Sequence, residues 1–213
     1  MNAQTQSLTL DGPAGALEAL IDLPDPEQFA APRGTAVIAH PHPLFSGTMT
    51  NKVVQTIARG VVQCGWRALR FNFRGVGASA GSYDKGAGEI EDMLAVVAAE
   101  AADGQPLLIA GFSFGAFVAS QVVARLHGEQ RAIDSIVLVG TAVSRFDAAP
   151  VPLELHPQTL VIHGEADDTV PLAAVMDWAR PQHLPVTVVP GGEHFFHGQL
   201  PLLKSLVVRH VRA

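Results

Sequence analysis

The chain has few charges, a single cysteine and no long apolar run. Charged residues make up 16% of its 213 residues, and Cys64 has no second cysteine with which to form an intrachain disulfide. The formal charge of −6 argues against a nucleic-acid partner, because phosphate contacts need a basic surface. No apolar run approaches the roughly 20 residues of a membrane-spanning helix. The first residues lack a basic segment followed by an apolar core, so we expect a cytoplasmic protein without a membrane partner.

Apolar residues make up 48% of the chain and fall in short continuous runs separated by helical patterns. Such alternation predicts a mostly parallel twisted sheet with helices on both faces. No internal repeat or linker interrupts it, so residues 1–213 are predicted to form a single α/β domain. The predicted strands cover residues 7–10, 17–23, 36–39, 68–73, 107–110, 136–139, 159–162 and 186–189.

The segment 111–115 (GFSFG) lies between one of these runs and a helical pattern that ends near Gly128. A G-x-S-x-G motif in this context is typical of a nucleophile elbow, a tight turn that holds the serine in a strained conformation. Only residues without bulky side chains fit on either side of the serine turn. Ser113 is therefore the candidate nucleophile.

A serine nucleophile needs a base within hydrogen-bonding distance and a third group that orients the base. The segment 163–171 (HGEADDTVP) follows one later strand, and 190–197 (PGGEHFFH) follows the next. These positions lie at the carboxyl ends of parallel strands, so they can meet in space. His194 is the predicted base, with His197 as its rival. The candidate acids are Asp167, Asp168 and Glu165.

Together these motifs resemble the α/β-hydrolase superfamily, specifically its small bacterial serine hydrolases without a lid. The order serine, acid, histidine matches that superfamily. The resemblance extends from about residue 36 to the end. It also includes 40–49 (HPHPLFSGTM), 51–54 (NKVV) and 71–77 (FNFRGVG). It implies an α/β-hydrolase fold of about eight strands without a cap domain, because roughly 18 residues between 140 and 159 are too few for a helical cap.

The resemblance also implies roles for individual residues. It places the orienting acid at Asp167, four residues after His163, while Asp168 is the alternative and could instead cap the following helix. The oxyanion hole would use the backbone N–H of Phe114 and one donor from the loop 40–44. Both prolines of that loop lack an N–H, so the second donor is His42 or Leu44. Analogy favours His42.

Two weaker patterns compete with this interpretation. His40 and His42 could ligate zinc with later histidines, but no acidic ligand lies in their loop. The glycines of 75–81 faintly resemble a dinucleotide fingerprint, yet their spacing is wrong and no helix follows directly. We therefore predict no metal and no organic cofactor. The glycine segment is predicted to be a close-packed turn that Arg74 anchors through an ion pair.

The sequence predicts a serine hydrolase that works by acyl transfer on a small-molecule ester, through an open and shallow site. A carboxylesterase for short-chain or accessible esters is the first choice, and a thioesterase or peptidase-like acyl hydrolase the second. A non-catalytic ligand-binding protein of the same fold is the alternative from another class. The sequence carries no pattern from which an oligomeric state could be predicted. Aromatic residues that could line the substrate pocket are Phe45, Phe112, Phe114, Phe195 and Phe196.

Overall fold

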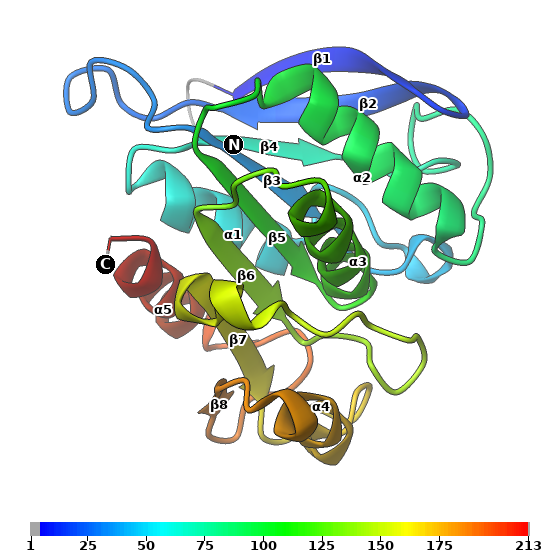
Figure 1. Ribbon diagram of the computed structural model, residues 1–213, viewed down its shortest axis with the longest axis vertical. Coiled ribbons are helices and arrows are strands. Elements are labelled where there is room, and N and C mark those ends of the chain that lie inside the picture. Colours follow the sequence, from blue (N-terminus) through cyan, green and yellow to red (C-terminus); the bar gives the residue numbers. More distant parts are fainter. Residues whose placement is uncertain (1–4, 213) are drawn as a thin grey trace.

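The computed structural model describes residues 5–212, which form an eight-stranded sheet with helices on both faces (Figure 1). The strands are β1 (Thr5–Gly12), β2 (Gly15–Asp22), β3 (Thr35–Ala39), β4 (Arg67–Phe71), β5 (Leu107–Phe112), β6 (Ser135–Val139), β7 (Thr159–Gly164) and β8 (Val186–Val189). The α-helices are α1 (Lys52–Val62), α2 (Ala87–Glu100), α3 (Phe114–Gly128), α4 (Leu172–Ala179) and α5 (Leu200–Arg212). Short 3-10 helices are η1 (Pro43–Phe45), η2 (Leu153–Gln158) and η3 (Arg180–Gln182).

The spatial order of the strands is β1-β2-β4-β3-β5-β6-β7-β8. Strands β1 and β2 are antiparallel to their neighbours, and β3 to β8 run parallel to one another. The predicted fold class, a mostly parallel sheet of about eight strands, is therefore confirmed. The carboxyl ends of β3, β5, β7 and β8 open on one edge of the sheet, where the loops carrying the sequence motifs meet.

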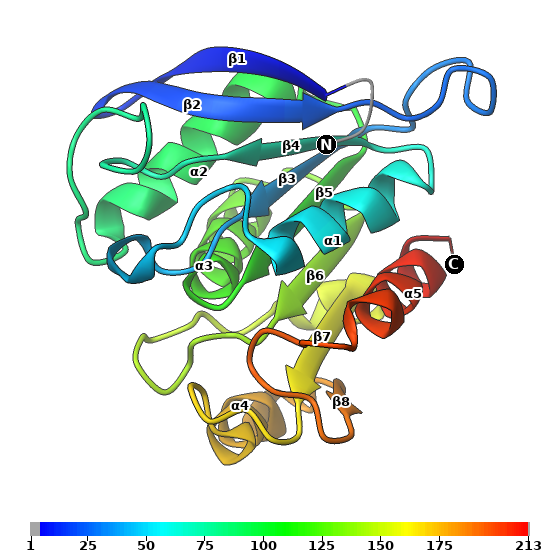
Figure 2. The same ribbon diagram turned by 180° about the vertical axis from the view of Figure 1, so that it is seen from behind.

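Alternating side chains of the strands feed two separate cores. On β5, Leu107 and Ile109 join the core under α2, α3 and α4, while Leu108 and Ala110 join the core under α1 and α5. Figure 1 shows α2 and α3 in front of the sheet, and Figure 2 shows α1 and α5 in front from the other side. Buried on both faces, the central strands are continuous apolar runs, as is typical of parallel sheets.

The predicted strand over residues 68–73 is too long, because β4 ends at Phe71. Just past β4, the Asn72 backbone N–H still donates to the Glu18 carbonyl at 2.8 Å, while its side chain enters a polar network. Its Oδ1 accepts from the Met49 N–H at 2.9 Å, and its Nδ2 donates to Glu18 Oε2 at 2.8 Å. The side chain of Ser79 then donates to the Asn72 carbonyl at 2.7 Å. These bonds bend the chain into the loop that leads to α2.

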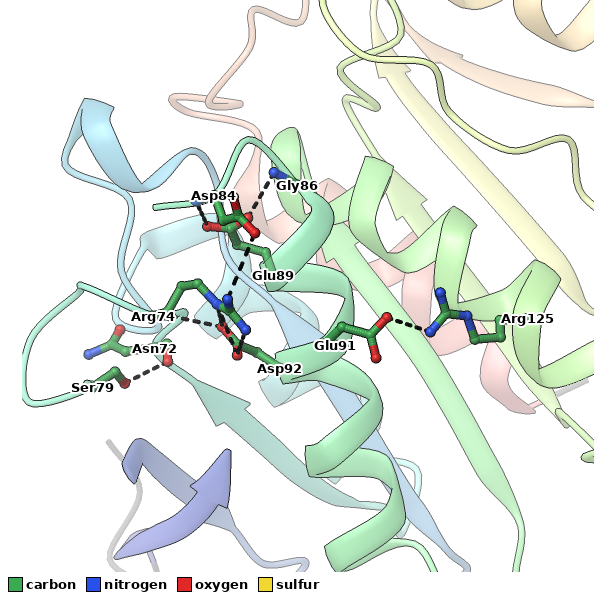
Figure 3. A network of polar contacts seen from close by, with 9 residues as sticks. All are labelled: Asn72, Arg74, Ser79, Asp84, Gly86, Glu89, Glu91, Asp92 and Arg125. Atoms are coloured by element: carbon green, nitrogen blue, oxygen red, sulfur yellow. Dashed lines mark hydrogen bonds and ion pairs between the residues drawn. The ribbon is translucent and has the colours of Figure 1, made fainter. Parts of the chain in front are cut away.

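Arg74 fixes this loop to α2 through a buried ion pair with Asp92 (Figure 3). The guanidinium donates to Asp92 Oδ1 at 2.7 Å, and the Arg74 backbone N–H donates to Asp92 Oδ2 at 3.0 Å. Gly75 and Gly77 have φ angles of 74° and 57°, so the glycines form a turn as predicted. At the end of the loop, the buried Glu89 accepts hydrogen bonds from the N–H groups of Gly86 and Asp84, which caps α2 (Figure 3).

We expect Arg74→Gln to lower the free energy of unfolding by about 3–5 kcal/mol, because it leaves the Asp92 carboxylate buried without its charge partner. The side chain of Asp92 is 0% exposed. A matched control is Arg125→Gln, which removes the exposed ion pair with Glu91 on the same helix (Figure 3). The control should cost no more than about 1 kcal/mol. Urea unfolding followed by circular dichroism measures both, and equal losses would contradict the prediction.

Among the helices of residues 5–212, none has the length and apolar character needed to cross a bilayer. The segment between β6 and β7 holds only the 3-10 helix η2, so no α-helical cap stands over the motif-bearing loops in the part of the chain described. The loops at this edge therefore face outward directly.

Candidate functional site

Ser113 lies at the turn between β5 and α3 with φ 57° and ψ −115°, a strained conformation for a residue other than glycine. The flanking glycines are required by close backbone approach. A Cβ on Gly111 would lie 2.2 Å from the Gly115 carbonyl oxygen, and a Cβ on Gly115 would lie 2.4 Å from that of Ala39. The motif thus has a steric origin: the backbone of α3 passes against β5 and β3, and the serine is pushed out at the apex.

The structure brings Ser113, His194 and Asp167 into one hydrogen-bonded chain. Ser113 Oγ lies 3.0 Å from His194 Nε2, and His194 Nδ1 lies 2.7 Å from Asp167 Oδ2. All three residues are buried, with 7% or less of their surface exposed. With its proton on Nδ1, His194 donates to Asp167 and leaves Nε2 free to accept the serine proton. Gly140, which follows β6 with a φ of 56°, lies beside the imidazole: a Cβ there would be 3.4 Å from His194 Cε1.

Asp167 is held by its own loop as well as by the histidine. Its Oδ1 accepts from the N–H groups of Thr169 at 3.0 Å and Val170 at 2.8 Å. Burial favours the neutral carboxyl, but the bonds from His194 and Val170 outweigh it and hold the pKa of Asp167 below its usual range. Asp167 is thus an anion whose two oxygens have separate partners.

His163 braces the same loop from below. Its Nε2–H donates to the Val170 carbonyl at 2.9 Å and lies 3.5 Å from Asp167 Oδ2. Burial lowers the pKa of His163, so its ring stays neutral beside the carboxylate. The neutral ring therefore orients the acid loop without adding a charge that would compete with His194.

The other sequence candidates for acid and base lie elsewhere. Asp168 accepts the hydroxyl of Thr169 and does not cap α4, and Glu165 accepts from the Gly191 N–H at 2.8 Å. His197 is exposed and pairs with Glu193. None of the three contacts Ser113 or His194 by hydrogen bond among residues 5–212.

The loop after β3 lies beside Ser113, since Pro41, His42 and Ser113 line the same cavity. The His42 ring packs on Phe114 and Tyr83, with centroids 5.0 Å and 4.8 Å apart. The Leu44 N–H is already engaged, donating to His42 Nδ1 at 3.2 Å, and the Leu44 side chain is exposed. The N–H groups of His42 and Phe114, in contrast, donate to no acceptor in the described part of the chain. Burial, and secondly the charge of Arg145, lower the pKa of His42.

A cavity of about 430 Å³ opens directly over Ser113 and His194. Phe45, Phe114 and Phe195 line it, and Phe45 is 73% exposed at its rim. Phe112 and Phe196 are fully buried outside the lining. The ring of Phe112 instead lies 4.9 Å from the ring of His194 and supports it from the α1 side of the sheet.

Two lining residues, Arg145 and Phe146, did not emerge from the sequence. They lie in the segment that follows β6, where no motif marks them. The aromatic side chain of Phe146 was the only feature of that segment that could have indicated a lining residue. Phe146 is stacked on Phe117 with ring centroids 4.9 Å apart, and this contact with α3 carries the segment back over the cavity.

His40 shapes the loop and is not available to a ligand. Its Nδ1 donates to the Pro41 carbonyl at 2.6 Å, and its Nε2 accepts from the Phe73 N–H at 3.1 Å. Both ring nitrogens are therefore occupied, so the His40 ring is excluded as a zinc ligand. Within residues 5–212, no three histidine, cysteine or acidic side chains gather closely enough to hold a metal ion.

The fully buried His40 should make stability depend on pH. Burial lowers its pKa from 6.5 to about 4. Between those values the unfolded chain binds more protons than the folded chain, so stability falls as the pH drops from about 6.5 to 4 and levels off below. At about 1.4 kcal/mol per pKa unit, His40 accounts for a loss of about 3 kcal/mol.

The variant His40→Gln keeps an acceptor and a donor but does not titrate. The free energy of unfolding of the native chain minus that of the variant, from urea unfolding at several pH values, should shrink by about 3 kcal/mol across this window. The buried His163 and His210, whose pKa values burial also lowers, are present in both proteins and cancel. His127→Gln, at a histidine of α3 whose side chain is 41% exposed, serves as control. A difference that stays constant with pH would refute the assignment.

Comparisons with known proteins show the family of the chain. Residues 46–158 match the family described as the alpha/beta hydrolase fold. An α/β serine hydrolase without a lid from Xanthomonas campestris is 38% identical, with a TM-score of 0.86 over 100% of this chain and 95% of the other. An α/β serine hydrolase homologue from Coxiella burnetii is 34% identical, with a TM-score of 0.78 over 96% of each chain.

The chain also has a relative known from its sequence. An uncharacterised protein of Rickettsia prowazekii is 34% identical over an alignment of 174 positions, which covers 76% of this chain and 71% of that protein. The family match and the two solved structures support a hydrolase. The chain belongs to the α/β-hydrolase fold family.

Proposed function

We propose that the protein is a carboxylesterase that transfers the acyl group of an ester to Ser113 and then to water. The observation that carries the proposal is the hydrogen-bonded chain from Ser113 through His194 to Asp167, opening on a cavity without a lid. A nucleophile, a base and an orienting acid in this geometry are the parts that acyl transfer needs.

In the first half of the reaction, His194 Nε2 takes the Ser113 proton while Oγ attacks the ester carbonyl carbon. The tetrahedral intermediate collapses when His194 returns the proton to the leaving alcohol, and the acyl group stays on Oγ. Water then attacks the acyl-enzyme with His194 as base again, which releases the carboxylic acid and restores the serine. Asp167 stabilises the imidazolium that forms in each half.

The negative charge of the intermediate needs two donors. The Phe114 N–H stands at the first position of α3, where a helix leaves its N–H groups without internal partners. We assign the His42 N–H as the second donor because the Leu44 N–H already donates to the His42 ring. One such donor is worth about 100- to 1,000-fold in rate.

The test compares three substrates that share the butyryl group and differ in the bond to be cleaved: 4-nitrophenyl butyrate, phenyl thiobutyrate and butyryl-4-nitroanilide. We expect the highest kcat/KM for the oxygen ester, and labelling of Ser113 by a fluorophosphonate probe, located by mass spectrometry. A preference for the thioester would indicate a thioesterase, and cleavage of the anilide at a similar rate a peptidase-like enzyme. A folded protein with neither turnover nor labelling would refute the proposal.

A further inference from the structure

Arg145 is the one permanently charged residue among the described residues that line the cavity. The rest of the wall is largely aromatic or small, and four phenylalanines are its largest members: Phe45, Phe114, Phe146 and Phe195. No aspartate, glutamate or lysine from residues 5–212 joins it. The chain as a whole is acidic, with a formal charge of −6, so a cavity with a single cation runs against the average charge of the protein.

The guanidinium of Arg145 is also unpaired among residues 5–212. It makes no ion pair or side-chain hydrogen bond with any described residue. Six other arginines each pair with a carboxylate: Arg67, Arg70, Arg74, Arg125, Arg131 and Arg180. Arg145 has no such carboxylate among the described residues, so the five donors of its guanidinium are available to a bound molecule.

The backbone that carries Arg145 is fixed relative to the nucleophile. The Ala142 N–H donates to the Ser113 carbonyl at 3.3 Å, and the Arg145 N–H donates to the Ala142 carbonyl at 3.1 Å. The next residue, Phe146, packs on Phe117 and also edge-on against Phe114, with ring centroids 5.1 Å apart. The exposed side chain can move, but the Arg145 backbone is held close to Ser113 by these two hydrogen bonds.

The charge of Arg145 is felt by another side chain of the cavity wall. It contributes, after burial, to the lowered pKa of His42, whose backbone lies in the oxyanion loop. The field that disfavours a proton on His42 favours an anion in the space between them. The guanidinium therefore acts on the cavity itself and not only on bulk solvent.

We propose that Arg145 selects ester substrates that carry a carboxylate near the scissile bond, such as half-esters of dicarboxylic acids. This inference rests on the proposed esterase function and names its substrate class. The aromatic wall would take the carbon chain, and the guanidinium would take the carboxylate in a charge-assisted hydrogen bond. Arg145 is thus a specificity residue that binds substrate and takes no part in proton transfer.

The test uses pairs of substrates matched except for charge. For a charged acyl group, 4-nitrophenyl monoadipate is compared with 4-nitrophenyl hexanoate. For a charged leaving group, 4-acetoxybenzoate is compared with 4-acetoxybenzamide. The quantity measured is the kcat/KM of the anionic substrate divided by that of its neutral partner, in native protein, Arg145→Gln and Arg145→Lys. Arg180→Gln is the matched control, because Arg180 is exposed and pairs with Asp177.

We expect Arg145→Gln to lower this ratio about 5- to 20-fold in at least one pair, mainly through KM, with Arg145→Lys in between. The ratio should stay unchanged in Arg180→Gln, and in the native protein it should fall as salt screens the pair. A merely structural role would slow both members of a pair alike.

A ratio unaffected by Arg145→Gln in both pairs, with hexanoate still hydrolysed, would overturn the inference and leave the esterase proposal standing. If the folded native protein turns over none of the four esters, the esterase proposal fails, and the inference fails with it.

Discussion

Ser113→Ala should lower kcat for 4-nitrophenyl butyrate by about 10⁴- to 10⁶-fold and abolish labelling by a fluorophosphonate. In the proposed mechanism the variant removes the oxygen that would form the acyl-enzyme, while the proposed donors at Phe114 and His42 and the cavity stay in place. Losses of this size are typical when the nucleophile of a serine-histidine-acid unit is removed. Residual turnover would come from the oxyanion donors and from binding alone.

A suitable control is Ser82→Ala, because Ser82 is exposed in the loop that precedes α2. It should keep the native rate and the native label. Circular dichroism and urea unfolding establish that both variants are folded. Turnover by Ser113→Ala within tenfold of the native rate would place the nucleophile elsewhere, and the mechanism above would then be wrong.

The features that could be predicted from the sequence are those that depend on local steric constraints and on hydrophobic periodicity. The elbow is predictable because only glycine fits at positions 111 and 115. A Cβ at either position would lie less than 2.5 Å from a backbone atom, so the constraint is visible in the sequence. The elements are predictable because strands buried on both faces must be apolar throughout. The end of β4 was missed, because the Asn72 side chain finds its partners at Glu18 and Met49, far away in the sequence.

Nonlocal packing decides the features that the sequence did not reveal. Neither the insertion of β4 between β2 and β3 nor the antiparallel β2 leaves a local pattern. Phe112 and Phe114 flank Ser113 symmetrically in the motif. In the structure, the Phe112 ring packs against His194 and the Phe114 ring packs against His42. Only the backbone path through the elbow distinguishes them. Arg145 likewise acquires significance only when its loop is folded over the cavity.

Asp167→Asn should lower kcat about 10⁴-fold while the fold and the substrate KM change little. The Thr169 and Val170 N–H groups both point at Oδ1, so they hold the amide oxygen in that position. The amide nitrogen must then face His194 Nδ1 at the place of Oδ2, where it can only donate. His194 would respond by carrying its proton on Nε2, the atom that must accept the proton of Ser113. A loss of this order is what the wrong tautomer costs in a serine protease triad.

Asp168→Asn is the matched control, one residue away and with the same chemical change. Asp168 is exposed and its carboxylate contacts only the Thr169 hydroxyl among the described residues, so its variant should retain nearly native kcat. The ring proton of His194, observed by NMR, should move from Nδ1 to Nε2 in Asp167→Asn alone. A full rate in Asp167→Asn, or an equal loss in both variants, would show that Asp167 does not set the tautomer. Because the two backbone donors fix which end of the amide faces the histidine, this loop specifies the protonation of the base as well as its orientation.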